Sequence, residues 1–151
     1  MAPDLTQEET LKMFKYIDGE LYVKTGYICS CGYNRVRVKG KQFMSHRVIF
    51  LMHHGYLPKL IDHIDGNRLN NNITNLRPAN KTQNSQNSKK RIDNISGFKN
   101  INWDKENKKW QVRLTINKKP ISFGYYDDLE LADLVAQEAR NKFYGDFARH
   151  N

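Results

Sequence analysis

The stretch from residue 61 to residue 87 (IDHIDGNRLNNNITNLRPANKTQNSQN) constrains the fold of this chain most. An Asp-His pair, Asp62-His63, ends a short apolar run, and Asp65-Gly66 behind it is typical of a chain reversal. A second short run, Asn75-Leu76-Arg77, precedes a polar, Asn-rich segment with weak helical character. The pattern predicts strand, loop, strand and helix, in that order along the chain.

The same stretch contains residues that can do chemistry. Hard divalent cations take oxygen ligands, which Asp62 and an Asn side chain supply. A histidine beside such a cation can take a proton from water near neutral pH. The competing interpretation is ordinary loop chemistry, in which an Asp-His pair is only solvated. We expect a turn role for most members of one polar set, namely Asp65, Gly66, Asn67, Asn70, Asn71 and Asn72.

Taken together, these residues resemble the HNH nucleases, in particular the homing-endonuclease branch. The resemblance rests on Asp-His-Ile-Asp-Gly-Asn at 62–67, Asn-Leu-Arg at 75–77 and Asn84, in that order. An upstream His-Arg-Val at 46–48 is similar to the segment that precedes the motif in that branch. The resemblance covers about residues 45–87 and implies a ββα-metal nuclease fold.

The resemblance also implies roles for individual residues. It makes His63 the general base that activates the attacking water. It makes Asp62 and Asn84 the ligands of one divalent ion, Mg²⁺ or Mn²⁺, on the scissile phosphate. Asn75 would brace the loop and orient His63.

Some assignments stay open at this point. Many HNH enzymes have His where this chain has Asn84, although Asn occurs there in the homing branch. Asn80 and Asn87 are nearby rivals for the ligand role. For His46 we favour a structural hydrogen-bonding role over a catalytic one.

Upstream of the motif, the pattern predicts two helices and three strands. A capping box at Thr6 and Glu9 starts a helix expected over 7–16, and Ser45 is expected to cap a buried helix over 46–53. The strands are expected at 21–28, 34–38 and 42–44.

From Ser96 the pattern changes to three strands and a helix, expected at 98–103, 109–116, 120–126 and from Asp127 or Asp128 to about Phe143. Apolar residues on one face of the helix are expected to cover the sheet (Ala132, Val135, Ala136, Ala139 and Phe143). The other sheet face stays open and should carry basic and polar side chains (Lys99, Arg113 and Thr115, with Asn102, Trp103 and Ser122 nearby). An antiparallel sheet of this kind can enter the DNA major groove.

The second half is similar to the DNA-binding domain of plant ethylene-response factors, the APETALA type. The similarity rests on SGFKNINW at 96–103, KWQVR at 109–113, FGYY at 123–126 and YGDFA at 144–148. It implies a sheet in the major groove, with DNA contacts from Lys99, Asn102, Arg113 and Thr115. The plant domains present more arginines on this face, which puts sequence specificity in doubt. Trp103 fits either the core or DNA.

The charge of the chain supports a nucleic-acid partner. The net charge is +9 over 151 residues, and residues 81–120 alone carry 11 basic and 3 acidic side chains. The cluster Lys89, Lys90 and Arg91 can steer a phosphate backbone. We place a linker at 93–97 and expect two domains, a nuclease domain over 1–92 and a DNA-binding domain over 96–151.

The cysteines and the apolar content restrict the expected cellular location. Cys29 and Cys31 cannot make a four-sulfur zinc site, and we expect them to be reduced and structural in a cytosolic protein. We find neither a signal peptide nor an apolar run of the roughly 20 residues that a membrane span requires. The expected location is the cytoplasm of a bacterial cell or of a phage-infected host.

The sequence thus predicts an α+β protein, with a ββα-metal HNH nuclease followed by a three-stranded antiparallel sheet and helix. The predicted activity is metal-dependent hydrolysis of double-stranded DNA, and the single motif copy favours a monomer over a homodimer. The alternative is a non-catalytic DNA-binding regulator on a degenerate HNH scaffold. A third interpretation, an RNA-binding protein, predicts a preference for single strands.

Overall fold

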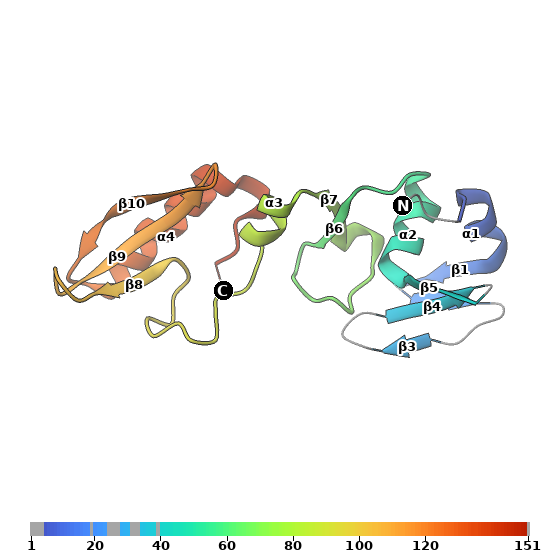
Figure 1. The fold of residues 1–151 in the computed structure, drawn as a ribbon, viewed down its shortest axis with the longest axis horizontal. Helices are drawn as coiled ribbons and strands as arrows, with labels where there is room; N and C mark the ends of the chain where they lie inside the picture. The colour runs from blue at the N-terminus through green and yellow to red at the C-terminus, as the bar shows by residue number, and fades with distance from the viewer. Residues whose placement is uncertain (1–4, 19, 24–27, 31–33, 39, 151) are drawn as a thin grey trace. The chain divides into compact units, whose positions relative to one another are not determined.

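The structure is a computed structural model that describes residues 5–18, 20–23, 28–30, 34–38 and 40–150 (Figure 1). The chain divides into two compact units, 1–81 and 82–151, and each is described by itself. The expected domain limits, 1–92 and 96–151, follow motifs rather than packing, and they stay a prediction. None of the described helices is long and apolar enough to cross a membrane.

The first unit mixes helices with short antiparallel strands. The strands pair as β1-β2, β3-β4-β5 and β6-β7. Its elements are α1 (Gln7–Met13), β1 (Phe14–Ile17), β2 (Glu20–Val23), β3 (Ile28–Ser30), β4 (Asn34–Val38), β5 (Lys41–Met44), α2 (Ser45–His54), β6 (Leu60–His63), the 3₁₀ turn η1 (Ile73–Asn75) and β7 (Leu76–Ala79).

The N-terminal helix is shorter than predicted. Thr6 and Glu9 form the expected capping box, but α1 ends at Met13 and the next residues form β1. Phe14 is buried, and the strand that it begins pairs with β2. Tertiary pairing therefore overrides the helical pattern here. Of the single strand expected at 21–28, the ends form β2 and β3, while 24–27 lie outside the described residues, as do Cys31 and the side chain of Cys29.

Helix α2 is the centre of the first core. Its residues Val48 to Met52 are all buried, as expected for a helix that is apolar on more than one side. The expected cap was wrong, because Met44 is the N-cap residue and makes no side-chain capping bond, while Ser45 is the first helical residue. The core also draws on Leu5, which precedes α1, and on several strands (Phe14, Leu21, Val36, Ile61 and Leu76).

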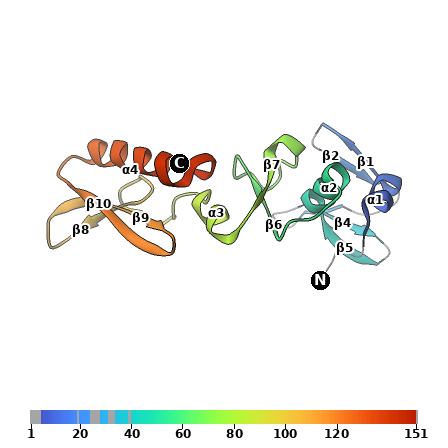
Figure 2. The same ribbon diagram turned by 90° about the horizontal axis from the view of Figure 1, so that it is seen from above.

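The second unit packs one helix on one face of a three-stranded sheet (Figure 2). The sheet is antiparallel in the order β10-β9-β8, as predicted. The elements that follow the first unit are α3 (Lys81–Gln86), which begins at that unit's last residue, then β8 (Ile101–Asp104), β9 (Lys109–Ile116), β10 (Lys119–Tyr126), α4 (Leu129–Tyr144) and the 3₁₀ turn η2 (Gly145–Phe147).

Strand alternation decides which face of the sheet is covered. Val112 and Leu114 are fully buried against α4, which contributes a stripe of alanines (Ala132, Ala136 and Ala139). Asp128 caps α4 by accepting from the backbone N–H of Leu131 at 2.7 Å. Phe143, expected on the buried face, is exposed. The opposite sheet face carries no helix of this unit.

The first strand of this sheet begins later than predicted, at Ile101 rather than residue 98. The segment before it turns, and Asn100 adopts a left-handed φ of 70°. The backbone N–H of Arg113 donates to Asn100 O at 3.0 Å, and Asn100 Nδ2 donates to Arg113 O. The turn is therefore attached to β9 without being a strand.

Candidate active site and nucleic-acid interface

The predicted strand, loop, strand and helix are present along the chain as β6, the loop 64–72 with η1, β7 and α3. Register pairs Asp62 with Arg77 and His63 with Leu76. Gly66, with φ of 67°, donates its N–H to His63 O at 2.8 Å, which closes the expected turn at the end of β6. The hairpin thus places Asp62 and His63 at the base of a long loop.

His63 is held by a residue of that loop. Its ring is buried, and Nε2 lies 3.2 Å from Oδ1 of Asn71, which is buried too. An amide oxygen can only accept, so Nε2 carries the ring proton in this arrangement. In the neutral ring, Nδ1 then has the lone pair.

The loop is built from side chains that mimic a backbone turn. The oxygen of each of four residues accepts the N–H two positions further on (Asp65 from Asn67, Asn67 from Leu69, Asn70 from Asn72 and Asn72 from Thr74). These are successive Asx turns, the local structure that Asn and Asp favour. The turn role expected for these residues is confirmed, whereas Asn71 differs because its side chain contacts His63.

Asn75 is the polar centre of the loop. Its Oδ1 accepts from Asp65 N at 3.0 Å, and its Nδ2 donates to Asp65 Oδ1 at 3.0 Å and to Asn70 O at 2.8 Å. Its backbone carbonyl accepts from Ile64 N, the residue that follows His63. Burial alone would raise the pKa of Asp65, but hydrogen bonds from Asn70, Asn67 and Asn75 outweigh it and lower that pKa. Asp65 therefore stays an anionic acceptor.

The Asp62 carboxylate is paired across the hairpin. Arg77 Nε donates to Asp62 Oδ2 at 2.9 Å, and Arg77 Nη2 lies 2.8 Å from the same oxygen. Both side chains are largely buried. A charge-assisted contact of this kind fixes the direction of a carboxylate. Asp62 is therefore an oriented anion immediately next to His63.

His46 borders this pair from α2. Its ring meets that of His63 edge to face, with centroids 5.2 Å apart. Burial, with smaller contributions from His63 and Arg47, lowers the pKa of His46 from 6.5 to about 4. His46 is therefore neutral at physiological pH and packs against His63 as an uncharged ring.

The N-terminal hairpin supports the far side of the loop. Tyr16 of β1 accepts with its hydroxyl from the backbone N–H of Ile73 at 2.9 Å. The same ring packs edge to face on His53 of α2, with centroids 4.9 Å apart. Residues distant in sequence therefore hold η1, the turn that contains Asn75.

The other predicted ligand, Asn84, belongs to the second unit and is described there. It is an exposed residue of α3, a short helix without a buried residue. Of its two rivals, Asn87 is buried just beyond the helix, with its N–H on Gln83 O at 3.0 Å, and Asn80 is exposed. The ligand assignment of Asn84 stays a prediction.

The residues of the described chain fit a divalent cation only in part. Asp62 is an oxygen donor of the type that Mg²⁺ and Mn²⁺ take, and amide oxygens are suitable partners. Within the described ranges, no group of three or more His, Cys, Asp or Glu side chains could hold a metal ion. A cation bound there therefore needs water and phosphate oxygens to complete its shell, as Mg²⁺ commonly does.

The open sheet face carries much of the predicted DNA-contact set. Arg113 and Thr115 of β9 are exposed on the face opposite α4, and Ser122 of β10 is the register partner of Arg113. Asn102 of β8 pairs with Gln111, so it lies on the same face. Gln111 Nε2 donates to the Tyr125 hydroxyl at 2.9 Å. The face thus combines a cation with amide and hydroxyl groups, which suit base edges.

Two predicted members of this face lie elsewhere. Lys99 is buried in the turn before β8, where its Nζ donates to the carbonyls of Gln86 at 2.6 Å and Ser88 at 2.7 Å. Burial lowers its pKa to about 8. Trp103 alternates with Asn102 and so lies on the helix side, where its ring packs on Trp110 at 4.9 Å. The expected position of Lys99 was wrong, because the turn at Asn100 delays the strand and Lys99 precedes it. For Trp103 the sequence left the core and the DNA face open, and its ring packs on Trp110.

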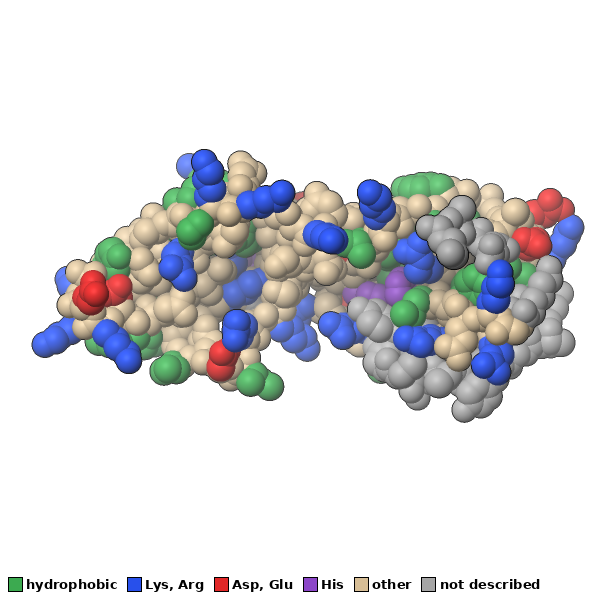
Figure 3. Space-filling view, in the orientation of Figure 1, with side chains coloured by type: hydrophobic (Ala, Val, Ile, Leu, Met, Phe, Trp, Pro, Cys, Tyr) green, Lys and Arg blue, Asp and Glu red, His purple; other side chains and the backbone are tan. Residues whose placement is uncertain are grey.

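The basic cluster before this sheet is exposed. Lys89, Lys90 and Arg91 all lie on the surface, and Arg91 makes an ion pair with Asp93 at 2.8 Å. Figure 3 shows Lys and Arg side chains distributed over the visible face of the second unit, with few acidic ones among them. This distribution matches the charge excess of residues 81–120.

Comparison with known proteins identifies the class of the first site. Residues 43–86 match the HNH endonuclease family, so the chain carries an HNH endonuclease domain. The chain is also 37% identical over 120 residues to Protein 3.8 of Escherichia phage T7, an alignment that covers 76% of this chain and 98% of that protein. The chain belongs to the same family as that phage protein. No solved structure matches it.

Two contacts of the site were not predicted from the sequence. Asn71 is one of several neighbouring asparagines, and nothing in the sequence distinguishes it from Asn70 or Asn72. The pairing of Arg77 with Asp62 had a usable signal, since opposite charges are favoured at facing positions of a hairpin. The long loop between β6 and β7 left the register undetermined.

Proposed function

We propose that the protein is an HNH endonuclease of the homing type that hydrolyses phosphodiester bonds of double-stranded DNA with one divalent metal ion. The observation that carries the proposal is the buried His63, oriented by Asn71 and adjacent to the oriented carboxylate of Asp62, inside the matched HNH segment. The phage relative is consistent with action in an infected bacterial cell.

His63 acts as general base in this proposal. With the ring proton on Nε2 and directed at Asn71, Nδ1 takes a proton from the attacking water. His46, neutral beside it, adds no positive charge next to the His63 ring. Asn75 keeps the loop closed, so that Asn71 stays in contact with the His63 ring.

Asp62 and Asn84 are the proposed ligands of the metal ion, Mg²⁺ or Mn²⁺. When bound, the ion supplies electrostatic stabilisation of the charge that develops on the phosphate and the leaving oxygen. When no cation is bound, the Arg77 guanidinium compensates the negative charge of the Asp62 carboxylate. The expected products have a 5′-phosphate and a 3′-hydroxyl.

The second unit locates the nuclease on DNA in this proposal. Its open face, with Arg113, Thr115 and Asn102, enters the major groove, and the exposed cations at 89–91 contact phosphates. The support is the exposure of these side chains on a sheet face without a helix. An ethylene-response-factor-like DNA-binding role is thus retained as part of the proposal, without the buried Lys99.

The test is cleavage of supercoiled plasmid that carries the DNA flanking the gene. Wild type is compared with His63→Ala and with the matched control His54→Ala, an exposed histidine of α2, each with Mg²⁺, with Mn²⁺ and with a chelator. We expect His63→Ala to cut roughly 10²–10⁴-fold more slowly, the contribution of a general base. Relaxed product indicates a nick by a monomer, and linear product a double-strand cut.

The opposite outcome is equally specific. A clear gel shift on the same DNA, abolished by high salt and weakened by Arg113→Ala, with no cutting under any metal condition, would establish the non-catalytic regulator instead. Binding to single-stranded RNA in preference to the duplex would favour the third interpretation.

A further inference from the structure

Two isoleucines of the loop between α3 and β8 are the most exposed large apolar side chains among the described residues. Ile92 is wholly exposed and Ile95 is 91% exposed. Scattered apolar residues are normal on a protein surface. Here, however, two β-branched side chains project into water from one short loop that also carries Lys89, Lys90 and Arg91.

The loop that carries them is fastened at several points. Lys90 Nζ donates to Gly97 O at 2.6 Å, which joins the two ends of the loop. Arg91 contacts both carboxylate oxygens of Asp93, at 2.9 and 2.8 Å. Asn94 Nδ2 donates to Phe98 O at 2.9 Å. Hydrogen bonds therefore link residues along the loop, while the two isoleucine side chains stay in solvent.

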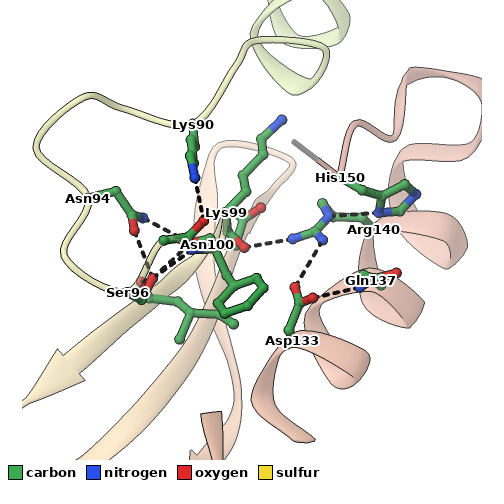
Figure 4. A network of polar contacts seen from close by, with 12 residues as sticks. Lys90, Asn94, Ser96, Lys99, Asn100, Asp133, Gln137, Arg140 and His150 are labelled. Carbon is green, nitrogen blue, oxygen red and sulfur yellow. Dashed lines mark hydrogen bonds and ion pairs between the residues drawn. The ribbon is translucent and has the colours of Figure 1, made fainter. Parts of the chain in front are cut away.

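The base of the loop is attached to the core of the second unit (Figure 4). Ser96 is buried, and its hydroxyl lies 2.9 Å from both Phe98 O and Ile101 O. The fully buried Arg140 of α4 donates from Nη1 to Lys99 O at 2.6 Å. The base of the loop is thus hydrogen-bonded to β8 through Ser96 and to α4 through Arg140.

The neighbouring charges indicate what covers the isoleucines. Lys89 and Lys90 are exposed beside them, and the segment 81–120 has 11 basic against 3 acidic side chains. Cations beside an apolar tip are complementary to duplex DNA, in which negatively charged phosphates border an apolar stack of bases. Several proteins insert Ile, Leu or Met between base pairs from the minor groove, which partly unstacks and kinks the DNA.

We propose that Ile92 and Ile95 form an apolar wedge that inserts between base pairs of duplex DNA, with Lys89 and Lys90 on the flanking phosphates. The inference rests on the proposed function, because it takes duplex DNA as the substrate. The wedge deforms DNA, while the open sheet face reads base edges. The two surfaces therefore have separate effects on the DNA.

The experiment measures binding and unwinding together. Full-length protein in a His63→Ala background, which slows cleavage, is bound to nicked plasmid, the nick is sealed with ligase, and the linking number is measured. The test variant combines Ile92→Ser with Ile95→Ser. The control combines Leu131→Ser with Leu134→Ser, two exposed leucines of α4.

We expect the parent and the leucine control to shift the linking number equally. The isoleucine variant should lose the shift and bind more weakly, by roughly tenfold to a hundredfold for each of the two isoleucines left unburied. Thermal unfolding without DNA should be unchanged, since both isoleucines lie in solvent.

Three results would overturn the wedge. If the parent shifts the linking number and the isoleucine variant shifts it equally, the wedge is wrong while DNA binding stands. If the parent binds no DNA, the wedge fails together with the proposed function. If the isoleucine variant melts at a lower temperature or loses self-association of the parent, these side chains serve a protein contact instead.

Discussion

The described residues of both units include a buried arginine–aspartate pair, and the two pairs differ in geometry. In the first unit, Arg77 and Asp62 approach to 2.8 Å at the mouth of a hairpin, beside His63. In the second unit, Arg140 and Asp133 are 3.7 Å apart, and the shortest contact of Arg140 is with the backbone carbonyl of Lys99. The first pair is a direct ionic contact, whereas the second arginine mainly ties chain segments together.

The difference separates a residue of the candidate site from a residue of the scaffold. In the proposed function, a carboxylate oriented by one arginine and flanked by a histidine exchanges that arginine for a metal ion, which in turn contacts the phosphate. Arg140 has no exposed surface and contacts a carbonyl, His150 and Asp133, so it is not available to a ligand. A buried ion pair by itself therefore does not mark a site.

Replacement of Arg140 by Met should have the largest effect. It leaves Lys99 O without its donor and Asp133 without its cation, and we expect a loss of roughly 3–5 kcal/mol in the free energy of unfolding of the second unit. Both tryptophans, Trp103 and Trp110, lie in that unit, so their fluorescence follows its unfolding in denaturant. Lys142→Met on the same helix is the control, and equal midpoints for the two variants would refute a scaffold role for Arg140.

Replacement of Arg77 by Met should cost less, roughly 2–3 kcal/mol, the range expected when one charged hydrogen-bonding partner of a buried side chain is removed. Mn²⁺ no longer competes with the guanidinium, so it should raise the melting temperature of this variant more than that of wild type. Calorimetry with and without Mn²⁺ measures this, with Lys59→Met as control. An equal Mn²⁺ shift in variant and wild type would show that Arg77 and the metal do not share Asp62.

Low pH should destabilise the unit that contains the Arg77–Asp62 pair, since His46 lies near that pair. Its folded pKa, about 4, is below the ordinary 6.5. Between these values the unfolded chain binds more protons, so stability falls as the pH falls below 6.5. The expected loss is about 2 kcal/mol at about pH 5. Denaturant unfolding of wild type and of His46→Gln at about pH 6.5 and at about pH 5 measures this loss of stability, with His54→Gln as control. A pH dependence unchanged by His46→Gln would contradict it.

Much of the second unit was predictable because its pattern is periodic. Val112, Leu114 and Ile116 alternate with polar residues, and β9 has the bounds predicted for it. Asp128 begins α4 as expected. The turn at Asn100 was not predictable, because its left-handed backbone depends on contacts with Arg113, on a strand that comes later in the sequence. Consequently Lys99 was assigned to a sheet face on which it does not lie.

In the first unit, the prediction came from a motif and not from periodicity. The motif predicted the order of elements and singled out His63 and Asp62, because few residue types can serve as base or ligand. The sequence could not show that Asn71 contacts His63 or that Tyr16 supports η1, since both contacts depend on how distant segments pack. The chemical type of a residue can be taken directly from the sequence, whereas the orientation of its side chain depends on how the whole unit packs.

The contact of Lys99 with Gln86 and Ser88 bears on how such a protein can be recombined. A chimera joined at residue 96, where the family motif starts, would separate that buried amine from both of its acceptors. A chimera joined at residue 82 would keep the amine and the acceptors in one fragment. We therefore expect a second unit transplanted from residue 82 to be more stable than one transplanted from residue 96.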